Sequence, residues 1–456
     1  MMSIHEAAHA IAALAQGADA GFRGVSTDSR SIVAGELFVA LKGENFDGHA
    51  YASEVLARGA TGAVVNQEFA AAHPDLPLIC VTDTRLALGA LAAQWRGRFA
   101  IPLIGITGSN GKTTVKEMCA AILRAQYGNA PDSVLATVGN LNNDIGLPLT
   151  LLKLRESHRA AVIEMGMNHA GEIDYLTRLA QPSVALVNNA QRAHLEGLGS
   201  VQDIALAKGE IFAGLSADGV AVFNADDAQV DVWRELSRDR RQVSFGLDQP
   251  ADVRGKFTLH GLGGELRLAT PWGEIDVTLA VPGCHNARNA CAAAAAALVA
   301  GASPAAVEQG LAGFVGVKGR LQRRAGRAGA LVVDDSYNAN PDSMRAAIDV
   351  LASVPGKRIL VMGDMGEAGA AAGQFHDEIG GYAKSHGIDR LLCIGEMSAA
   401  AAANFGAGGR HFLRVDDLVR TLLTELEPQT TVLVKGSRFM RMERVVDEIV
   451  EKNEKQ

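Results

Sequence analysis

The sequence predicts an α/β protein with three domains, and three observations support this prediction. The chain has 456 residues, which is too long for one ordinary hydrophobic core. Helical and strand patterns alternate along it, and apolar runs such as 161–163 and 184–187 are typical of strands in a buried parallel sheet. The alternation restarts after a segment rich in Gly and Arg, 313–327, which is typical of a linker or hinge. We therefore expect domains at 1–82, 83–316 and 317–456.

The composition is that of a globular protein, with 48% hydrophobic and 21% charged residues. The 43 basic and 51 acidic residues give a net charge of −8, which provides no general attraction for nucleic acid or an anionic membrane. We therefore expect neither as a partner, and no apolar run is long enough to span a bilayer. The five cysteines are scattered without a C-x-x-C pair, which favours reduced thiols in a cytoplasm. No heptad-spaced apolar stripe indicates a dimer, so we expect a monomer.

The first domain combines short strands and helices, with strands expected around 37–41 and 63–65 and a helix at 51–58. Two polar clusters, 26–30 (STDSR) and 42–49 (KGENFDGH), flank the first of these strands. They supply hydroxyls, a guanidinium and glycine turns of the kind used in binding sites. Ser, Asp and Gly also dominate ordinary turns and caps, so both interpretations stay open on the residues alone.

The most informative segment of the second domain is 101–118 (IPLIGITGSNGKTTVKEM). An apolar strand runs into a Gly-rich turn at 108–111 and then into a helix that begins near Lys112. Backbone N–H groups in such a turn surround an anion, and the helix N-terminus adds partial positive charge. Lys112 would neutralise the β- and γ-phosphates of a nucleotide, and Thr113 would hold Mg²⁺.

The match to a phosphate-binding loop is not perfect. The strict pattern G-x-x-x-x-G-K-[ST] is missed by one position, because Ile106 stands where the first Gly is required, whereas T-G-x-x-G-K-T-T fits. The alternative is that the glycines only serve a tight strand-to-helix turn. Two glycines just before Lys-Thr-Thr, between a strand and a helix pattern, disfavour that alternative. The prediction is a nucleoside triphosphate site.

Three further polar residues of this domain are candidates. Glu164 directly follows the strand 161–163, so it would lie near a magnesium-bound phosphate if that strand neighbours the one before the phosphate loop. Taken alone, Glu164 is equally a surface carboxylate. His194 follows the next strand, although a single His is usually structural. Lys208 lies on a predicted helix, where its ordinary interpretation is a solvated, snorkelling lysine.

Two later segments complete the second domain. Short alternating runs with turn residues at 257–279 predict a small antiparallel excursion. The segment 283–289 opens an alanine-rich helix, with Asn286 and Asn289 on one face. The alternative there is that Asn286 only caps the helix.

The third domain restarts the strand and helix alternation as a second open α/β unit. Polar loops, 334–341, 363–367 and 435–438, follow three of its predicted strands. Ligands of such sheets bind beyond the carboxyl ends of the strands. Together with Arg320, these loops would complete a site shared between two domains.

Six sequence motifs follow one another along the chain. They are T-G-S-N-G-K-T-T, E-M-G-x-N-H-x-G-E-I, A-H-L-E-x-x-G-S, A-K-G-E-I-F, H-N-x-x-N and D-D-S-Y-N-A-N-P-D-S-M. In these motifs the chain resembles the Mur ligases of peptidoglycan synthesis, over nearly its whole length. The stretches 139–146, 335–341 and 434–437 are most similar to members that add D-alanyl-D-alanine to UDP-N-acetylmuramoyl-tripeptide. Members that add a single amino acid, and folylpolyglutamate synthases, resemble these stretches less.

The resemblance implies an N-terminal domain for the UDP-sugar, a central P-loop ATPase that uses ATP and Mg²⁺, and a Rossmann-like C-terminal domain that receives the dipeptide and contacts the nucleotide. It also implies residue roles. The nucleotide would be bound by Gly108, Ser109, Asn110, Gly111, Lys112, Thr113, Thr114, Asn289, Arg320 and Asp335. Mg²⁺ would be held by Thr113, Glu164, His194 and Lys208, the last as a carbamate, and the catalytic residues would be Lys112, Glu164, His194 and Lys208. The UDP-substrate would be bound by Thr27, Asp28, Ser29, Arg30, Asp47 and His49, and the dipeptide by Lys435 and Ser437.

The implied reaction is an ATP-dependent amide synthesis. ATP would phosphorylate the terminal carboxylate of the UDP-tripeptide, and the amine of D-alanyl-D-alanine would attack the acyl phosphate. Two alternatives remain. One is a related ligase that adds a single amino acid, and the other is a P-loop ATPase that acts as a switch and releases phosphate without any amine acceptor.

Overall fold

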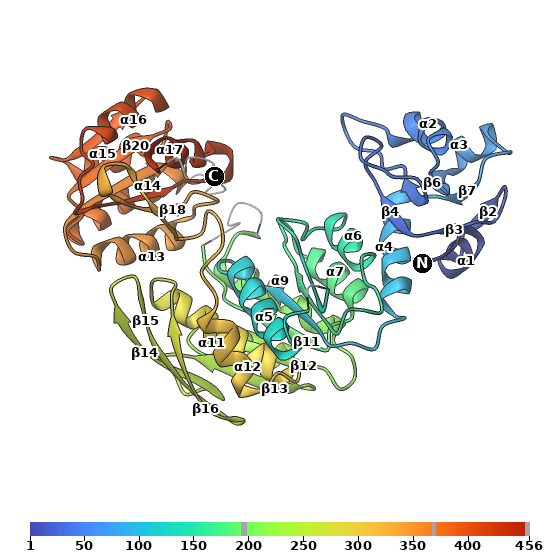
Figure 1. Ribbon diagram of the computed structural model, residues 1–456, viewed down its shortest axis with the longest axis horizontal. Coiled ribbons are helices and arrows are strands. Elements are labelled where there is room, and N and C mark those ends of the chain that lie inside the picture. Colours follow the sequence, from blue (N-terminus) through green and yellow to red (C-terminus); the bar gives the residue numbers. More distant parts are fainter. Residues whose placement is uncertain (131, 193–197, 367–370, 452–456) are drawn as a thin grey trace.

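The structure is a computed structural model that describes residues 1–130, 132–192, 198–366 and 371–451. Figure 1 shows three α/β bodies arranged in an arc, in the order of the sequence. The first (blue) and the third (orange to red) lie at the two ends, and the second (green to yellow) lies between them. Each body is built on its own main sheet, so the predicted three-domain α/β class is confirmed.

The first body has a five-stranded sheet in the order β2-β7-β6-β5-β4, in which β4 to β7 are parallel and β2 is antiparallel. The expected strands appear as β5 and β6, and the expected helix as η1 followed by α2. Its strands are β1 (Met2–Ser3), β2 (Leu14–Gln16), β3 (Gly21–Phe22), β4 (Gly24–Ser26), β5 (Glu36–Val39), β6 (Gly62–Asn66) and β7 (Leu78–Val81). Its helices are α1 (Ile4–Ala10), η1 (Gly48–Tyr51), α2 (Ala52–Ala57) and α3 (Gln67–Ala72).

A single helix, α4 (Thr84–Arg96), connects the first body to the second (Figure 1). Asp83 caps its N-terminus by accepting hydrogen bonds from the backbone N–H groups of Arg85 and Leu86. At its other end, Trp95 donates to the carbonyl of Leu154 at 3.1 Å, and the buried Arg96 binds carbonyl groups of the central body. The helix start therefore lies at the edge of the first body while its end is anchored in the second.

The central sheet has nine strands in the order β16-β15-β14-β13-β12-β11-β8-β10-β9. The strands from β9 to β14 pair in parallel, and β14, β15 and β16 pair antiparallel, as expected for 257–279. The strands are β8 (Leu103–Thr107), β9 (Val134–Ala136), β10 (Ala160–Glu164), β11 (Val184–Val187), β12 (Val220–Asn224), β13 (Arg241–Gly246), β14 (Val253–His260), β15 (Gly263–Thr270) and β16 (Gly273–Leu279).

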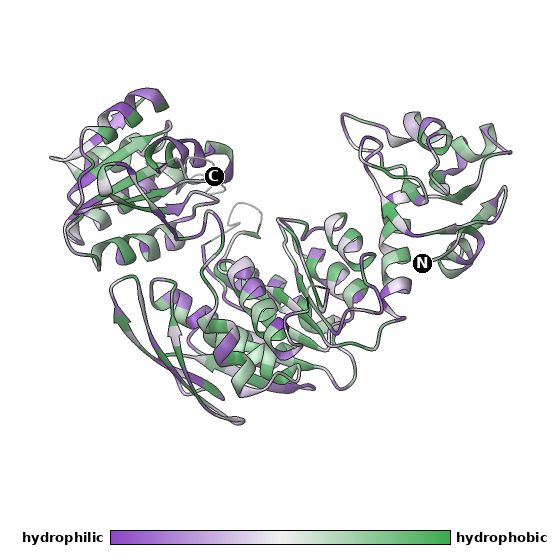
Figure 2. Ribbon diagram, in the orientation of Figure 1, coloured by the Kyte–Doolittle hydropathy of each residue, from purple (hydrophilic) through white to green (hydrophobic). Residues whose placement is uncertain are grey.

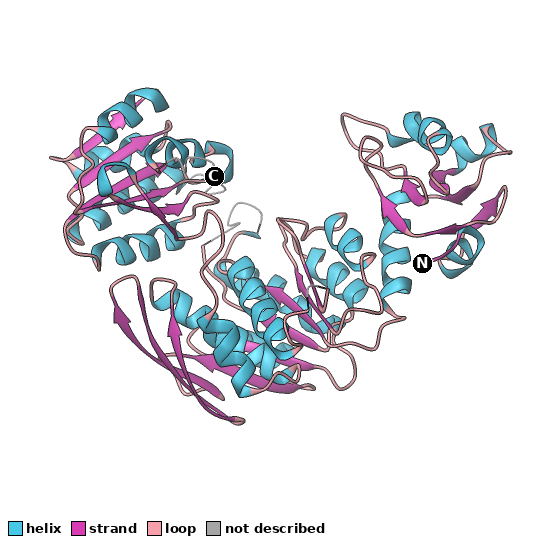
Figure 3. Cartoon of the chain, viewed as in Figure 1, coloured by secondary structure: helices cyan, strands magenta, loops and turns pink. Residues whose placement is uncertain are grey.

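Helices cover both faces of this parallel region, because successive side chains of its strands point to opposite faces and both sets are apolar. One set packs with α4, α6 and α7, and the other packs with α5 and α11. Figure 3 shows helices lying along the central strands, and Figure 2 shows many hydrophobic residues in these elements. The helices are α5 (Lys112–Gln126), α6 (Gly146–Leu151), α7 (Glu172–Ala180), α9 (Val201–Gly209), η2 (Glu210–Gly214), α10 (Val230–Leu236), α11 (Cys284–Val299) and α12 (Pro304–Ala312).

The third body has a six-stranded sheet in the order β17-β18-β22-β19-β20-β21, parallel except for β17. The segment predicted as a linker, 313–327, contains β17, which pairs with β18, so only part of it is a connection. The strands are β17 (Gln322–Ala325), β18 (Leu331–Asp335), β19 (Lys357–Gly363), β20 (Arg390–Ile394), β21 (Gly409–Phe412) and β22 (Thr430–Lys435). The helices are η3 (Arg327–Gly329), α13 (Pro341–Ala352), α14 (Ala372–Ser385), α15 (Ser398–Phe405), η5 (Arg438–Met440), α16 (Val415–Leu423) and α17 (Glu443–Ile449).

Among the described residues, no helix combines the length and the apolar character needed to cross a membrane.

Candidate active site

The phosphate loop connects β8 to α5 as the sequence predicts, and the end of β11 holds it in place. The backbone N–H of Ser109 donates to the carbonyl of Asn189 at 3.0 Å, and that of Asn110 donates to the Asn189 side chain at 2.8 Å. Gly111 has φ +79°, and a Cβ there would lie 2.5 Å from Asn289 Oδ1 and 2.6 Å from Asn188 Nδ2. Glycine is therefore required at 111 both by its backbone conformation and by the close approach of two amide side chains.

Lys112 opens α5 and folds over the loop. Its Nζ donates to the carbonyl of Gly108 at 2.7 Å. The same ammonium therefore lies at the mouth of a turn whose following helix presents its N-terminus, which concentrates positive charge where an anion would bind.

A buried carboxylate lies next to the loop, as expected from the neighbouring strands. β10 pairs in parallel with β8, so Glu164, at the end of β10, reaches the start of α5. Its Oε2 accepts a hydrogen bond from Thr113 Oγ1 at 2.9 Å, and its Oε1 accepts one from Asn142 Nδ2 at 2.8 Å. Glu164 is 2% exposed, so the alternative of a surface carboxylate at a strand end is wrong.

Arg320 from the linker region also reaches this point. Its Nη2 donates to Thr113 Oγ1 at 3.0 Å, and its guanidinium lies over the ring of Tyr337 at 4.4 Å. The Thr113 hydroxyl therefore donates to a carboxylate of the central body and accepts from an arginine near the start of the third body. The expectation that Arg320 joins a site between two domains agrees with this position.

Lys208 lies on α9 and is 1% exposed, so the alternative of a solvated, snorkelling lysine is wrong. No hydrogen bond or ion pair joins its ammonium to any residue that the structure describes. Burial, with a further contribution from the nearby positive charge of Lys112, lowers the pKa of Lys208 well below its usual range. A lysine in this environment favours its neutral amine form. His194, the remaining predicted metal ligand, lies outside the described residues.

In the third body, the predicted residues Asp335 and Lys435 pair with each other. They end the adjacent strands β18 and β22, and Lys435 Nζ lies 2.6 Å from Asp335 Oδ2. Both side chains are nearly buried, and burial raises the pKa of Asp335 despite the opposing charge of Lys435. Ser437 is also engaged, because its hydroxyl donates to the carbonyl of Ala339 and accepts from the N–H of Gly366.

Asn289 lies beside the phosphate loop on α11, where its Oδ1 accepts from Asn188 Nδ2 at 2.9 Å. Asn286 does not cap α11, since its Nδ2 donates to the carbonyl of Pro282. His285 precedes them and partly faces the cleft. Burial and the neighbouring charges of Lys435 and Arg288 lower the pKa of His285 to about 4.

The polar clusters of the first body lie at the carboxyl edge of its sheet but apart from the phosphate loop. Asp28 accepts hydrogen bonds from the Arg30 guanidinium at 2.8 and 2.9 Å. Asp47 caps η1 and accepts from His49 Nδ1 at 2.6 Å, while His49 Nε2 accepts from the N–H of Asn66. These contacts agree with the interpretation of the two clusters as turns and helix caps. Thr27 and Ser29 flank Asp28 in the loop between β4 and β5.

A cleft with a volume of about 1370 Å³ unites most of these groups. It extends from the N-terminal end of α4, with Asp83 and Arg85, past the phosphate loop to the loops that follow β18 and β22. Sequence reasoning named most of its central lining but missed several residues: Arg85, Asn142, Asp144, Gln191, Arg192, Arg288 and Asp342. Asn142 and Asp144 lie within the family-like stretch 139–146, and Arg288 lies within the segment 283–289. Asp342 lies within the motif D-D-S-Y-N-A-N-P-D-S-M, whereas Arg85, Gln191 and Arg192 carry no local pattern.

A phosphate loop on a mostly parallel sheet, with the loops of a second open α/β body facing it across one cleft, defines a nucleotide-dependent P-loop enzyme. Three family models match successive parts of this chain: the Mur ligase family catalytic domain at 21–96, the Mur ligase middle domain at 106–297, and the Mur ligase glutamate ligase domain at 319–438. The chain belongs to the Mur ligase family, and it is an enzyme of the ligase class.

Individual relatives agree with this assignment. The chain is 46% identical to the UDP-N-acetylmuramoyl-tripeptide--D-alanyl-D-alanine ligase of Escherichia coli (strain K12), over 94% of each chain. A crystal structure of MurF from Acinetobacter baumannii superposes with a TM-score of 0.90 at 36% identity and covers 99% of both chains. The MurF ligase of Thermotoga maritima, solved in complex with ADP, superposes with a TM-score of 0.80 at 28% identity, over 93% of this chain and 96% of that one.

Proposed function

We propose that this protein adds D-alanyl-D-alanine to UDP-N-acetylmuramoyl-tripeptide, with ATP converted to ADP and phosphate. The observation that carries the proposal is the single cleft that joins the start of α4, the phosphate loop and the loops of the third body. A long substrate with its sugar end near the first body and its carboxylate near Lys112 fits such a cleft. Two relatives named for this activity match this chain over 94% of its length, which supports the same UDP-substrate and the same acceptor.

ATP would place its phosphates on the loop from Gly108 to Thr114, with Asn289, Arg320 and Asp335 contributing further contacts. The Thr113 hydroxyl and the Glu164 carboxylate are oxygen donors of the kind Mg²⁺ prefers, and they lie 2.9 Å apart. When bound there, Mg²⁺ would screen the phosphate charge. Lys112 would offset the repulsion between the substrate carboxylate and the γ-phosphate and stabilise charge on the transferring group.

Lys208 fits its proposed modification to a carbamate. Only a neutral amine reacts with CO2, and burial shifts the side chain toward that form. The product would be an anion next to Lys112, in place of a buried neutral amine. His194 is the remaining proposed metal ligand of this set.

The chemistry requires an acyl phosphate because a carboxylate is a poor electrophile. The neutral amine of the dipeptide attacks the activated carbon and forms the amide bond, and phosphate leaves. Water must be excluded while the acyl phosphate exists, so the third body is expected to close over the cleft. The loop with Lys435 and Ser437 borders the cleft and is the proposed dipeptide contact, although Lys435 is already paired with Asp335.

The proposed domains remain 1–82, 83–316 and 317–456, and the UDP group is proposed to contact Thr27 to Arg30, Asp47 and His49. We further propose a monomer in the cytoplasm. The free thiols of all five cysteines agree with a reducing compartment.

The decisive experiment measures phosphate release from Mg-ATP in the presence of UDP-N-acetylmuramoyl-tripeptide, with D-alanyl-D-alanine, with single amino acids, or with no acceptor. Release that needs the dipeptide, together with the mass of the UDP-pentapeptide, is the expected result. Release with a single amino acid would move the protein to a related ligase. Release without any acceptor would favour an ATPase switch.

A further inference from the structure

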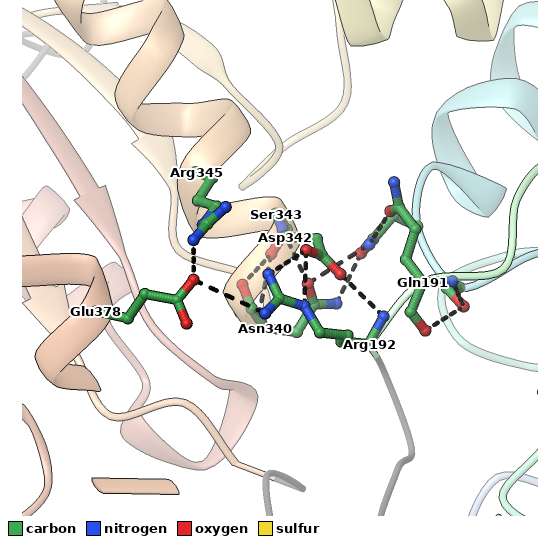
Figure 4. A network of polar contacts seen from close by, with 9 residues as sticks. Gln191, Arg192, Asn340, Asp342, Ser343, Arg345 and Glu378 are labelled. Atoms are coloured by element: carbon green, nitrogen blue, oxygen red, sulfur yellow. Dashed lines mark hydrogen bonds and ion pairs between the residues drawn. The ribbon is translucent and has the colours of Figure 1, made fainter. Parts of the chain in front are cut away.

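Arg192 crosses from the central body to the third body immediately after the segment that supports the phosphate loop. Figure 4 shows its side chain reaching the start of α13 and the side chain of Glu378 on α14. Three of its N–H groups donate to one carboxylate: its backbone N–H to Asp342 Oδ2 at 2.9 Å, and its Nε and Nη2 to Asp342 Oδ1 at 3.0 and 2.6 Å. Both carboxylate oxygens of Asp342 are therefore occupied by one residue of another domain.

The surroundings of this contact hold the guanidinium from two more sides. Nη1 of Arg192 lies 3.8 Å from Glu378 Oε1, and Glu378 also pairs with Arg345. The guanidinium lies over the ring of Phe375, 5.5 Å from its centroid. Arg192 and Asp342 are only 28% and 21% exposed, so solvent screens this pair less than an ordinary surface pair.

A second contact from the same helix end reaches the phosphate loop itself. Asn340 caps α13 in a reciprocal arrangement with Ser343, which fixes the first turn of the helix. The Asn340 Nδ2 donates to Asn110 Oδ1 at 2.8 Å. Asn110 in turn donates to Gln191 Oε1 at 2.6 Å, next to Arg192. The start of α13 is thus joined to the phosphate loop and to the segment behind it at adjacent points.

We infer that Arg192 is a positioning residue, and that its contact with Asp342 is an interdomain latch that holds the start of α13 against the phosphate loop. The cleft that would receive the nucleotide is lined by both bodies, so its binding-competent form requires them to be held together. The latch assembles that form before the nucleotide arrives. Without it, the competent form is a smaller fraction of the population, and the apparent affinity falls by that fraction.

The inference rests on the proposed function only for the identity of the ligand, because a latch between two bodies exists whichever acceptor the enzyme uses. Among the residues that the structure describes, the side-chain partners of Arg192 are Asp342, Glu378 and Phe375, and we assign none of these to phosphate transfer. Its loss is therefore expected to change the binding of the nucleotide more than the rate of the chemical step.

The test is a double-mutant cycle with Arg192→Ala, Asp342→Ala and the double variant, in which calorimetry measures the Kd of Mg-ADP. We expect each single variant to raise this Kd about tenfold, as for the loss of one charged hydrogen-bonded contact, and the double variant to add little. In the nucleotide-free protein, small-angle scattering should show a larger radius of gyration for Arg192→Ala. Steady-state kinetics should show the KM for ATP rising more than kcat falls.

Arg267→Ala is the matched control, because Arg267 pairs with Asp276 at 2.7 Å within one body. It should change neither the Kd nor the radius. Any of three results would overturn the latch. They are effects of the two single variants on the Kd that add in the double variant, a Kd of a single variant within twofold of the original, and an unchanged radius of gyration for Arg192→Ala. Both readouts use nucleotide alone, so they remain decisive if the acceptor is not D-alanyl-D-alanine. Conversely, a failed latch leaves the acceptor assay untouched.

Discussion

Replacing Lys208 with Met should raise the thermal stability of this protein while lowering its activity. Burial lowers the pKa of Lys208 well below its usual range, whereas the unfolded chain keeps this lysine protonated up to about pH 10.4. Between the folded and unfolded pKa values, the unfolded state binds one more proton, so the free energy of unfolding increases with pH. The destabilisation caused by Lys208 is therefore largest at low pH and disappears above about pH 10.4.

The size of the effect follows from the burial of the side chain. Met has a similar length and no titratable group, so it avoids the cost of burying a lysine, which is about 1.4 kcal/mol for each unit by which the pKa is lowered. We take about 2 kcal/mol at neutral pH, which corresponds to a Tm increase of about 4–8 °C for a domain of this size. Activity should fall about 100-fold, because the variant cannot form the carbamate.

The assay is scanning calorimetry of both proteins at pH 6, 7.5 and 9.5 in buffer free of CO2. The difference in Tm should shrink as the pH rises. Lys153→Met, which removes an exposed lysine of the same domain, is the control and should leave Tm nearly unchanged. Bicarbonate should raise the Tm of the original protein but not that of Lys208→Met, and short carboxylic acids should partly restore the activity of Lys208→Ala. A lower Tm for Lys208→Met, or a difference that does not depend on pH, would refute this reasoning.

Three further predictions concern groups around the cleft. Gly111→Ala should weaken Mg-ADP binding at least about tenfold by calorimetry, because the left-handed backbone of a residue with a Cβ costs about 1–2 kcal/mol, before the clash of the Cβ with Asn188 and Asn289 is added. Gly128→Ala is the control that should bind normally, because Gly128 also has a positive φ, +74°, but open space around its Cβ. Glu164→Gln should keep the fold but raise the Mg²⁺ concentration needed for half-maximal activity about tenfold, and an unchanged Mg²⁺ requirement would remove Glu164 from the metal site. Asp335→Asn and Lys435→Met should each reduce the free energy of unfolding in urea by about 3–5 kcal/mol, while the double variant loses less than their sum; strict additivity would contradict a buried pair.

The sequence alone predicted the three-part α/β organisation, the phosphate loop, and the place of Glu164 at a strand end. These features are local: a turn that needs Gly111, a helix start at Lys112 and runs of apolar residues each follow from a few adjacent positions. The family motifs extended this to residues such as Asn289 and Arg320, because their order along the chain is itself a pattern. The 313–327 segment shows the limit of such reasoning, since its Gly and Arg content concealed the edge strand β17.

Tertiary structure decided what distant residues do to one another. The helix pattern around Lys208 describes an ordinary lysine, and only the surrounding fold buries it and changes its pKa. Asp335 and Lys435 were assigned to different ligands, yet adjacent strands bring them together. Arg192 and Asp342 lie 150 positions apart, and nothing in either segment signals their contact. Burial and pairing depend on which surfaces meet in three dimensions. A local sequence pattern therefore identifies the polar and charged side chains but does not show which residues they contact.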